Sequence, residues 1–207
     1  MERLHKVSAA FVFAFLCLHF ANHFAGLLGV DAHLQFMDAA RLIYRGPVIE
    51  GAVLLAFFVQ ILTGFALSLT IWREKKDIIH QLQAASGAYL SVFVILHVAS
   101  IAVARMLLNL DTNFYFAASG FTDPAWKYVA YAFYGLAIFS LFIHMGCILY
   151  DIFKKTNKPV GWLLLIVTLG IGGYATYALL MMFSGQLYHV AIPNVYAHVF
   201  GQALNGH

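Results

Sequence analysis

Charged residues are scarce in this chain. Asp, Glu, Lys and Arg make up 10% of its 207 residues, whereas an ordinary soluble domain carries about 25%. Cysteine and proline are also rare, with two and four residues, which excludes a disulfide-stapled secreted module and a collagen-like fibre. The hydrophobic share of 62% excludes a disordered chain and argues against a soluble enzyme. The composition therefore predicts an integral membrane protein.

Long stretches without Asp, Glu, Lys or Arg divide the sequence. They cover 7–30, 51–72, 78–104, 128–150 and the chain from Pro159 onward. About 20 apolar residues, rising about 1.5 Å each, cross a hydrocarbon core about 30 Å thick, so every stretch is long enough to span. Because regular alternation of apolar and polar residues is missing, the backbone is expected to form helices.

We therefore predict one all-α membrane domain over residues 1–207, an integral bundle of five transmembrane helices. The predicted helices cover 7–29, 48–72, 82–108, 126–152 and 160–183. Segment 31–46 is amphipathic and is expected to lie in the membrane interface. Segment 110–124 is predicted to be a loop, and the tail 185–207 an interfacial segment whose role the sequence does not reveal.

The basic residues predict the orientation of the bundle. Eight of the twelve lie at the N-terminus and in the connections after the second and fourth predicted helices. The positive-inside rule then places the N-terminus in the cytoplasm and the C-terminus outside. The basic residues are too dispersed to suggest a nucleic-acid partner. The absence of a transit peptide favours a multi-pass protein of a bacterial inner membrane.

Four of the ten histidines are predicted at membrane depth: His19, His23, His97 and His144. Ionisable residues are costly there and usually have a function. A neutral imidazole is the usual axial ligand of b-type haem, which needs two histidines facing each other at similar depth. His97 and His23 each lie eight residues inside a bounding charge, and His19 lies one turn deeper. Either can pair with His97, or each histidine can simply hydrogen-bond a neighbouring helix.

His144 and a group of three glycines in the predicted spans also suggest a role. His144 has no evident histidine partner, because the facing polar residue on the second helix is Gln60, a poor iron ligand. A hydrogen bond between helices explains His144 about as well as iron ligation does. The glycines of the last helix, Gly170, Gly172 and Gly173, are expected to permit close helix packing.

Glu50 opens the second predicted helix on its outer side, shortly after Tyr44 and Arg45. A carboxylate at this depth can accept protons from a quinol bound between helices. The alternative is that Glu50 only complements the dipole of the helix.

The pattern resembles a known family at this point. Five helices with an inner N-terminus and histidines on the first, third and fourth helices are similar to the single-chain cytochrome b membrane subunit of succinate dehydrogenase and fumarate reductase. The resemblance covers about residues 4–180 and includes several local matches. These are Leu4-His5, the His19…Asn22-His23-Phe24 region, Arg45…Glu50, and the run Leu82-Gln83-Ala84-Ala85-Ser86-Gly87 followed by His97.

The resemblance implies a ligand set. In dihaem members the first and third helices hold an outer haem, which implies His97 with His19 or His23. The second and fourth helices hold an inner haem, for which this chain offers His144 but has Gln60 in place of the other histidine. One haem b is therefore expected, and two only if another residue serves as the missing ligand.

The resemblance also implies a quinone site and partners. The outer carboxylate of some members binds menaquinol, which implies a site of Glu50, Arg45 and Tyr44. The chain would pass electrons between haem b and a membrane quinone, as an electron-transfer subunit rather than an enzyme on its own. Flavoprotein and iron–sulfur subunits would bind its cytoplasmic face, because the chain has no flavin fingerprint and no cysteine motif.

Two alternatives are left open. A free-standing cytochrome b would exchange electrons with quinone without a flavoprotein. A haem-free membrane anchor or scaffold would keep the fold after losing its haem ligands. Two positions favour this hypothesis: Gln60 stands in place of a histidine ligand, and Ala84 stands where the family often has an arginine.

Overall fold

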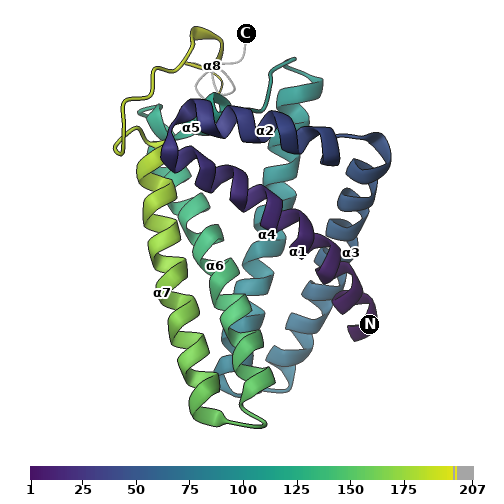
Figure 1. The fold of residues 1–207 in the computed structure, drawn as a ribbon. Coiled ribbons are helices and arrows are strands. Elements are labelled where there is room, and N and C mark those ends of the chain that lie inside the picture. The colour runs from purple at the N-terminus through teal and green to yellow at the C-terminus, as the bar shows by residue number, and fades with distance from the viewer. Residues whose placement is uncertain (198, 200–207) are drawn as a thin grey trace. The chain divides into compact units, whose positions relative to one another are not determined.

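A computed structural model describes residues 1–197 and 199, and every regular element in that part of the chain is a helix (Figure 1). Five of these helices are long and apolar enough to cross a membrane. They are α1 (Glu2–Ala25), α3 (Pro47–Arg73), α4 (Ile78–Met106), α6 (Lys127–Phe153) and α7 (Lys158–Phe183). The prediction of an all-α chain with five helices of spanning length is confirmed, and their number and apolar character support a multi-pass membrane protein.

The spanning helices carry large apolar side chains on their outside. Phe58 is 59% exposed and Ile166 is 63% exposed, whereas the small polar residues Thr63, Ser68 and Ser91 are buried. Such a surface would be unstable in water, but lipid tails solvate it as well as a protein core does. Small buried residues let helix backbones approach each other, which is how membrane helices gain packing energy.

Two helix starts differ from the sequence prediction. The first predicted helix, 7–29, in fact begins at Glu2, and the short 3-10 helix η1 (Gly26–Leu28) follows it. Gly29 then has a φ of 128°, which only glycine adopts readily, and this turns the chain into the next helix. Helix α4 begins four residues before position 82, because Asp77 Oδ1 accepts the backbone N–H of Ile79 at 3.1 Å and caps the helix.

The predicted loop at 110–124 is wrong in its central part. Residues Phe114–Thr122 form the helix α5, and all but three of them are buried. Asn113 caps this helix, because its side-chain oxygen accepts the backbone N–H groups of Tyr115 at 3.0 Å and Phe116 at 3.4 Å. An Asn that satisfies two free N–H groups is a strong helix start, so the segment folds despite its short length.

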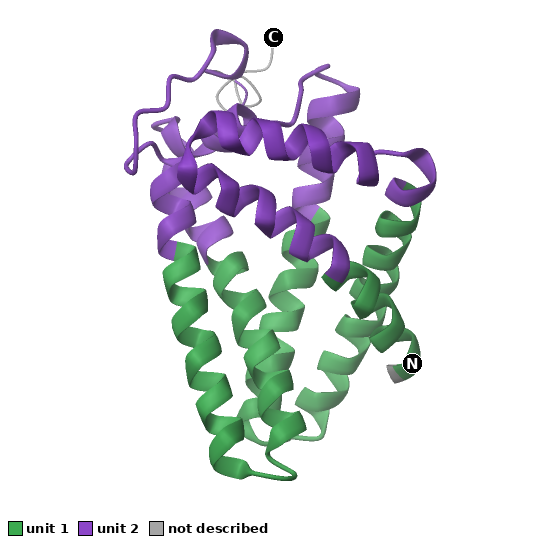
Figure 2. Ribbon diagram, viewed as in Figure 1, with its two compact units in different colours: residues 1–13, 51–95, 136–176 green, residues 14–50, 96–135, 177–207 purple. Residues whose placement is uncertain are grey.

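The chain divides into two compact units (Figure 2). Unit 1 consists of Met1–Phe13, Gly51–Ile95 and Leu136–Thr176. Unit 2 consists of Ala14–Glu50, Leu96–Gly135 and Tyr177–His207. Each unit draws on several helices, and the single domain over residues 1–207 stays a prediction.

Unit 1 is held by close helix contacts. Cys147 is fully buried and clusters with Ile79, Tyr150 and Leu165. Gly172 lies so close to α6 that a Cβ at this position would be 2.7 Å from Cγ of Phe142. A Cβ at Gly170 or Gly173 would meet no atom within 4 Å. The packing role predicted for the three glycines is therefore confirmed for Gly172 and wrong for the other two.

Unit 2 contains the shorter helices α2 (Val30–Tyr44), α5 and α8 (Asn194–Ala197). Helix α2 covers most of the segment predicted to be amphipathic, and it buries one face with His33, Met37 and Ala40. The described part of the tail packs on this unit, because Tyr188 donates its hydroxyl to the Gly26 carbonyl at 2.5 Å. Residues 198 and 200–207 of the predicted tail segment lie outside the described part.

Candidate functional site

In unit 2, α1 and α4 bring two of the predicted ligands together. The ring centroids of His19 and His97 are 6.4 Å apart, and the ring planes are inclined by 71°. A bond from an imidazole nitrogen to a metal is about 2 Å long, so two rings that bind one ion from opposite sides have centroids about 6 Å apart. Both rings are only partly buried, so protein atoms do not fully enclose them. The pair therefore fits the spacing of a bis-histidine iron site.

His23 takes part in a different set of contacts. Its Nε2 lies 3.1 Å from Nε2 of His19, and its Nδ1 lies 3.4 Å from Nε2 of His33 on α2. The side-chain nitrogen of Asn22 lies 3.2 Å from the same His33 nitrogen. Both ring nitrogens of His23 are thus engaged by other histidines, which makes His19 the better placed partner of His97.

Aromatic rings surround the two opposed histidines. Phe15 stacks on His19 with centroids 5.5 Å apart, and Tyr44 meets Phe15 edge-on at 5.7 Å. Tyr134 meets His97 edge-on at 5.9 Å. Aromatic rings in such positions are typical of a site that binds a large flat ligand and limits the access of water.

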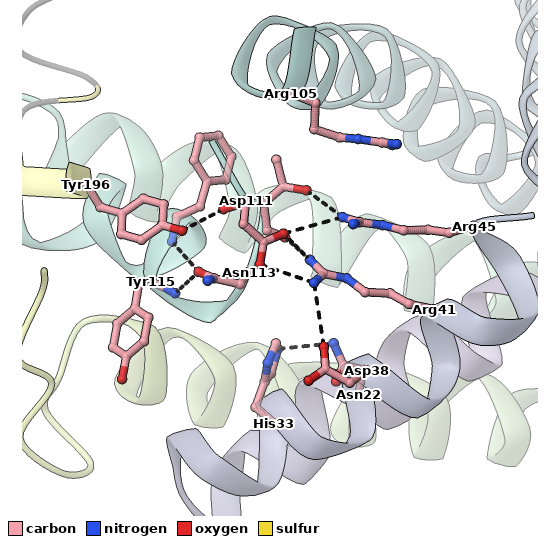
Figure 3. A network of polar contacts seen from close by, with 12 residues as sticks. Asn22, His33, Asp38, Arg41, Arg45, Arg105, Asp111, Asn113, Tyr115 and Tyr196 are labelled. Carbon is pink, nitrogen blue, oxygen red and sulfur yellow. Dashed lines mark hydrogen bonds and ion pairs between the residues drawn. The ribbon is translucent and has the colours of Figure 1, made fainter. Parts of the chain in front are cut away.

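A network of arginines and carboxylates forms the polar part of unit 2 (Figure 3). Arg41 makes a two-pronged contact with Asp111, at 2.7 Å and 3.2 Å. Arg45 donates to the Thr112 hydroxyl at 3.3 Å and lies 3.6 Å from Asp111. Burial raises the pKa of Asp111, but the hydrogen bond and charge of Arg41 and the charge of Arg45 outweigh it and hold the pKa below its usual value.

Glu50 belongs to the same unit but has another partner. Its Oε1 lies 2.5 Å from Nη1 of Arg105 on α4, whereas the sequence places it near Arg45. The difference arises because α2 and α3 are separate helices, so proximity in the chain does not bring these two side chains into contact. Tyr44, the third residue of the predicted quinone site, reaches the histidine pair through Phe15.

In unit 1, α4 fixes the orientation of His144. Its Nδ1 lies 3.0 Å from the carbonyl oxygen of Gln83 and therefore carries the proton that is donated there. The other ring nitrogen is left with its lone pair, which is the orientation usual for metal-binding histidines. The ring lies against Gly87, where a Cβ would be 3.0 Å from Cε1 of His144.

The side chain of Gln60, which stands in place of a histidine ligand of the family, contacts His5. Its side-chain nitrogen lies 3.1 Å from Nε2 of His5, and its oxygen accepts the Ser8 hydroxyl at 2.6 Å. Sequence reasoning missed His5, since it lies outside the predicted first helix. His5 precedes His19 by fourteen residues, and this spacing returns to nearly the same face of a helix. The shared face was the signal in the sequence that could have pointed to His5.

The structure also adds His33, which the sequence left in an interfacial segment without a role. It is 2% exposed, and its Nδ1 is buried without a hydrogen-bond partner among the described residues. Burial, and then the charge of Arg41, lower the pKa of His33 to about 4. The ring is therefore neutral at physiological pH.

His33 is expected to make the stability of the protein depend on pH. The unfolded chain protonates this residue near its ordinary pKa of 6.5, whereas the folded chain resists protonation down to about 4. Stability is thus lost as the pH falls between these values, by about 2 kcal/mol at about pH 5. The measurement is the unfolding midpoint of the purified protein against pH, for wild type and for His33→Asn. An identical slope in both proteins would contradict this assignment.

We compared the chain with protein-family models, with curated proteins and with solved structures. None of the three comparisons gave a match.

Proposed function

We propose that the chain is a b-type cytochrome membrane subunit, which binds haem between His97 and His19 and passes electrons between that haem and a membrane quinone. The observation that carries the proposal is the 6.4 Å separation of the two rings on facing helices. The aromatic rings of Phe15 and Tyr134 beside them support it, because haem is a large flat ligand. The haem, when bound, supplies one-electron chemistry that side chains alone do not offer.

The arginines of unit 2 support the same proposal. Arg41, Arg45 and Arg105 bring three guanidinium groups to a region that also holds three carboxylates, Asp38, Asp111 and Glu50. Arginine is well suited to bind carboxylates through paired N–H donors. Each guanidinium carries five N–H donors, more than these contacts use, and such donors suit the carboxylate side chains that a haem carries.

A quinone site at Glu50, Arg45 and Tyr44 is part of the proposal. Glu50 is held in place by its ion pair with Arg105, and an ionisable residue at a membrane interface is a candidate for a functional role such as contact with a quinol. Arg45 retains a donor for a quinone oxygen beyond its contacts with Thr112 and Asp111. The resemblance adds flavoprotein and iron–sulfur subunits at a cytoplasmic face. The distribution of Lys and Arg supports an N-terminus on that side and a C-terminus outside, and the proposed location is the cell (inner) membrane.

Two other functions compete with this proposal. A free-standing cytochrome b would use the same haem site and quinone but would purify without flavoprotein or iron–sulfur partners. A haem-free scaffold is favoured by one specific observation: Nε2 of His19 already contacts Nε2 of His23 at 3.1 Å, so a hydrogen bond to a neighbouring side chain accounts for this nitrogen. The colour of the purified protein distinguishes a cytochrome b from a haem-free scaffold, because only the cytochrome contains haem.

The first experiment is a reduced-minus-oxidised absorption spectrum of the purified full chain, with the haem measured per chain. We expect a sharp low-spin α-band and at least one haem per chain, because two imidazoles bind the iron. A colourless protein, purified from cells with ample haem, would overturn the proposal and leave the scaffold. Co-purification of flavoprotein and iron–sulfur subunits separates the respiratory subunit from the free-standing cytochrome.

A further inference from the structure

Unit 2 contains a cavity that the proposed function does not use. Its volume is about 490 Å³, which falls in the range of about 300–1,000 Å³ typical of small-molecule sites. The end of α5, the start of α6 and the turn that follows α7 line it, and none of the lining residues is a histidine or an acidic residue. The residues on which the argument depends are Phe121, Lys127, Tyr128, Tyr131 and Gln186.

Lys127 brings a positive charge to this cavity. Its ammonium lies 5.0 Å from the ring centroid of Tyr128, and it takes part in none of the ion pairs between the described residues. Asp123, four residues earlier, is engaged by its own loop, because its Oδ1 accepts the backbone N–H groups of Ala125 at 2.8 Å and Trp126 at 3.2 Å. The cavity therefore offers an ammonium group whose N–H donors are not taken up by a carboxylate.

Tyr131 adds a neutral donor to the same cavity. Gln186 donates a side-chain N–H to the Tyr131 hydroxyl at 2.6 Å, so this oxygen is the acceptor there and keeps its own hydrogen for another partner. The buried ring of Phe121 meets the Tyr131 ring edge-on, with centroids 5.6 Å apart, and fixes its position. An ammonium and a phenol hydroxyl in one cavity suit an oxyanion, which accepts charge-assisted hydrogen bonds from such groups.

The cavity lies where two spanning helices end. Lys127 is the first residue of α6, and Gln186 follows Phe183, the last residue of α7, by three positions. Tyr128 is 73% exposed, and Tyr177 on the last turns of α7 is 63% exposed. Exposed tyrosines near the ends of spanning helices are typical of the headgroup level of a membrane. The oxyanion that a membrane itself supplies at this level is the phosphate of a phospholipid.

We propose that this cavity of unit 2 binds the phosphate headgroup of an anionic phospholipid. Lys127 pairs with the phosphate, Tyr131 donates a hydrogen bond to it, and the exposed side chain of Val129 contacts an acyl chain. A zwitterionic headgroup fits less well, because no acidic residue lines the cavity to pair with its cation. The proposal does not require haem, so it can fail or hold independently of the proposed function.

The test is lipid binding by the purified full chain, stripped of lipid in detergent and measured by native mass spectrometry. We expect phosphatidylglycerol to bind more tightly than phosphatidylcholine or inorganic phosphate. Lys127→Gln is expected to weaken phosphatidylglycerol binding about fivefold, the effect of one lysine near anionic lipid, whereas Lys127→Arg should restore it. Lys155→Gln is the matched control, because it removes the charge of an exposed lysine outside the cavity, and it should bind as the wild type does.

Tyr131→Phe keeps the ring that packs on Phe121 and removes the hydroxyl, so we expect weaker binding with an unchanged unfolding midpoint in the absence of lipid. Equal binding of phosphatidylglycerol by the wild type and Lys127→Gln would overturn the proposal, as would equal binding of phosphatidylglycerol and phosphatidylcholine. Inorganic phosphate that binds as tightly as phosphatidylglycerol would indicate a site for the free anion and overturn the assignment to lipid. The haem content that the proposed function predicts is not expected to change in any of these variants.

Discussion

Replacement of His97 by alanine is expected to remove one haem per chain together with its low-spin spectrum. The reason is geometric, because His97 on α4 and His19 on α1 have ring centroids 6.4 Å apart, close to the separation of a bis-histidine site. Alanine leaves an iron with one protein ligand, and the remaining imidazole does not hold the haem through purification. The measurement is haem per chain by absorption after reduction.

The same experiment distinguishes the two candidate partners on α1. His19→Ala is expected to match His97→Ala, whereas His23→Ala should keep its haem, because both ring nitrogens of His23 already contact other histidines, His19 and His33. His189→Ala is the control, since this histidine is exposed. Full haem content in His97→Ala, or loss in His23→Ala alone, would show that the ligands are assigned wrongly.

The spanning helices could be predicted because charged side chains are costly in lipid and therefore stand at the ends of such helices. Charges bound the first four stretches on both sides and the fifth at its start, and the corresponding helix ends lie within a few residues of these bounds. Helix α5 was missed for a physical reason, since nine residues are too few to span and too few to show a helical period. The Asn113 cap was the only local signal for its start.

The candidate site was predicted in its residue types but not in its pairings. His97, His19 and His23 could be found because ionisable residues are rare at membrane depth. The choice of His19, and the contact of Glu50 with Arg105, depend on the rotation and tilt of whole helices, which packing determines. His5 was passed over because Arg3 and Lys6 flank it, and the charges made this turn look like a loop.

Replacement of Gly172 by alanine is expected to destabilise the folded protein by about 2 kcal/mol. The added Cβ would overlap the Cβ of Phe142 and lie 2.7 Å from its Cγ. These atoms are fixed to the α6 backbone, so no rotation of the ring can remove the overlap. Helices α6 and α7 must therefore move apart, and the packing that membrane helices rely on is lost.

Gly170→Ala is the matched control on the same helix. Its Cβ would meet no atom within 4 Å, and alanine favours a helix over glycine by about 1 kcal/mol, so this variant should be as stable as the wild type or slightly more so. Unfolding of the full chain in detergent by heat measures both. Equal unfolding midpoints for the two variants would mean that α6 and α7 do not pack through Gly172. A lower midpoint in Gly172→Ala alone would support the contact between Gly172 and Phe142, which fixes α7 against α6, the helix that carries His144.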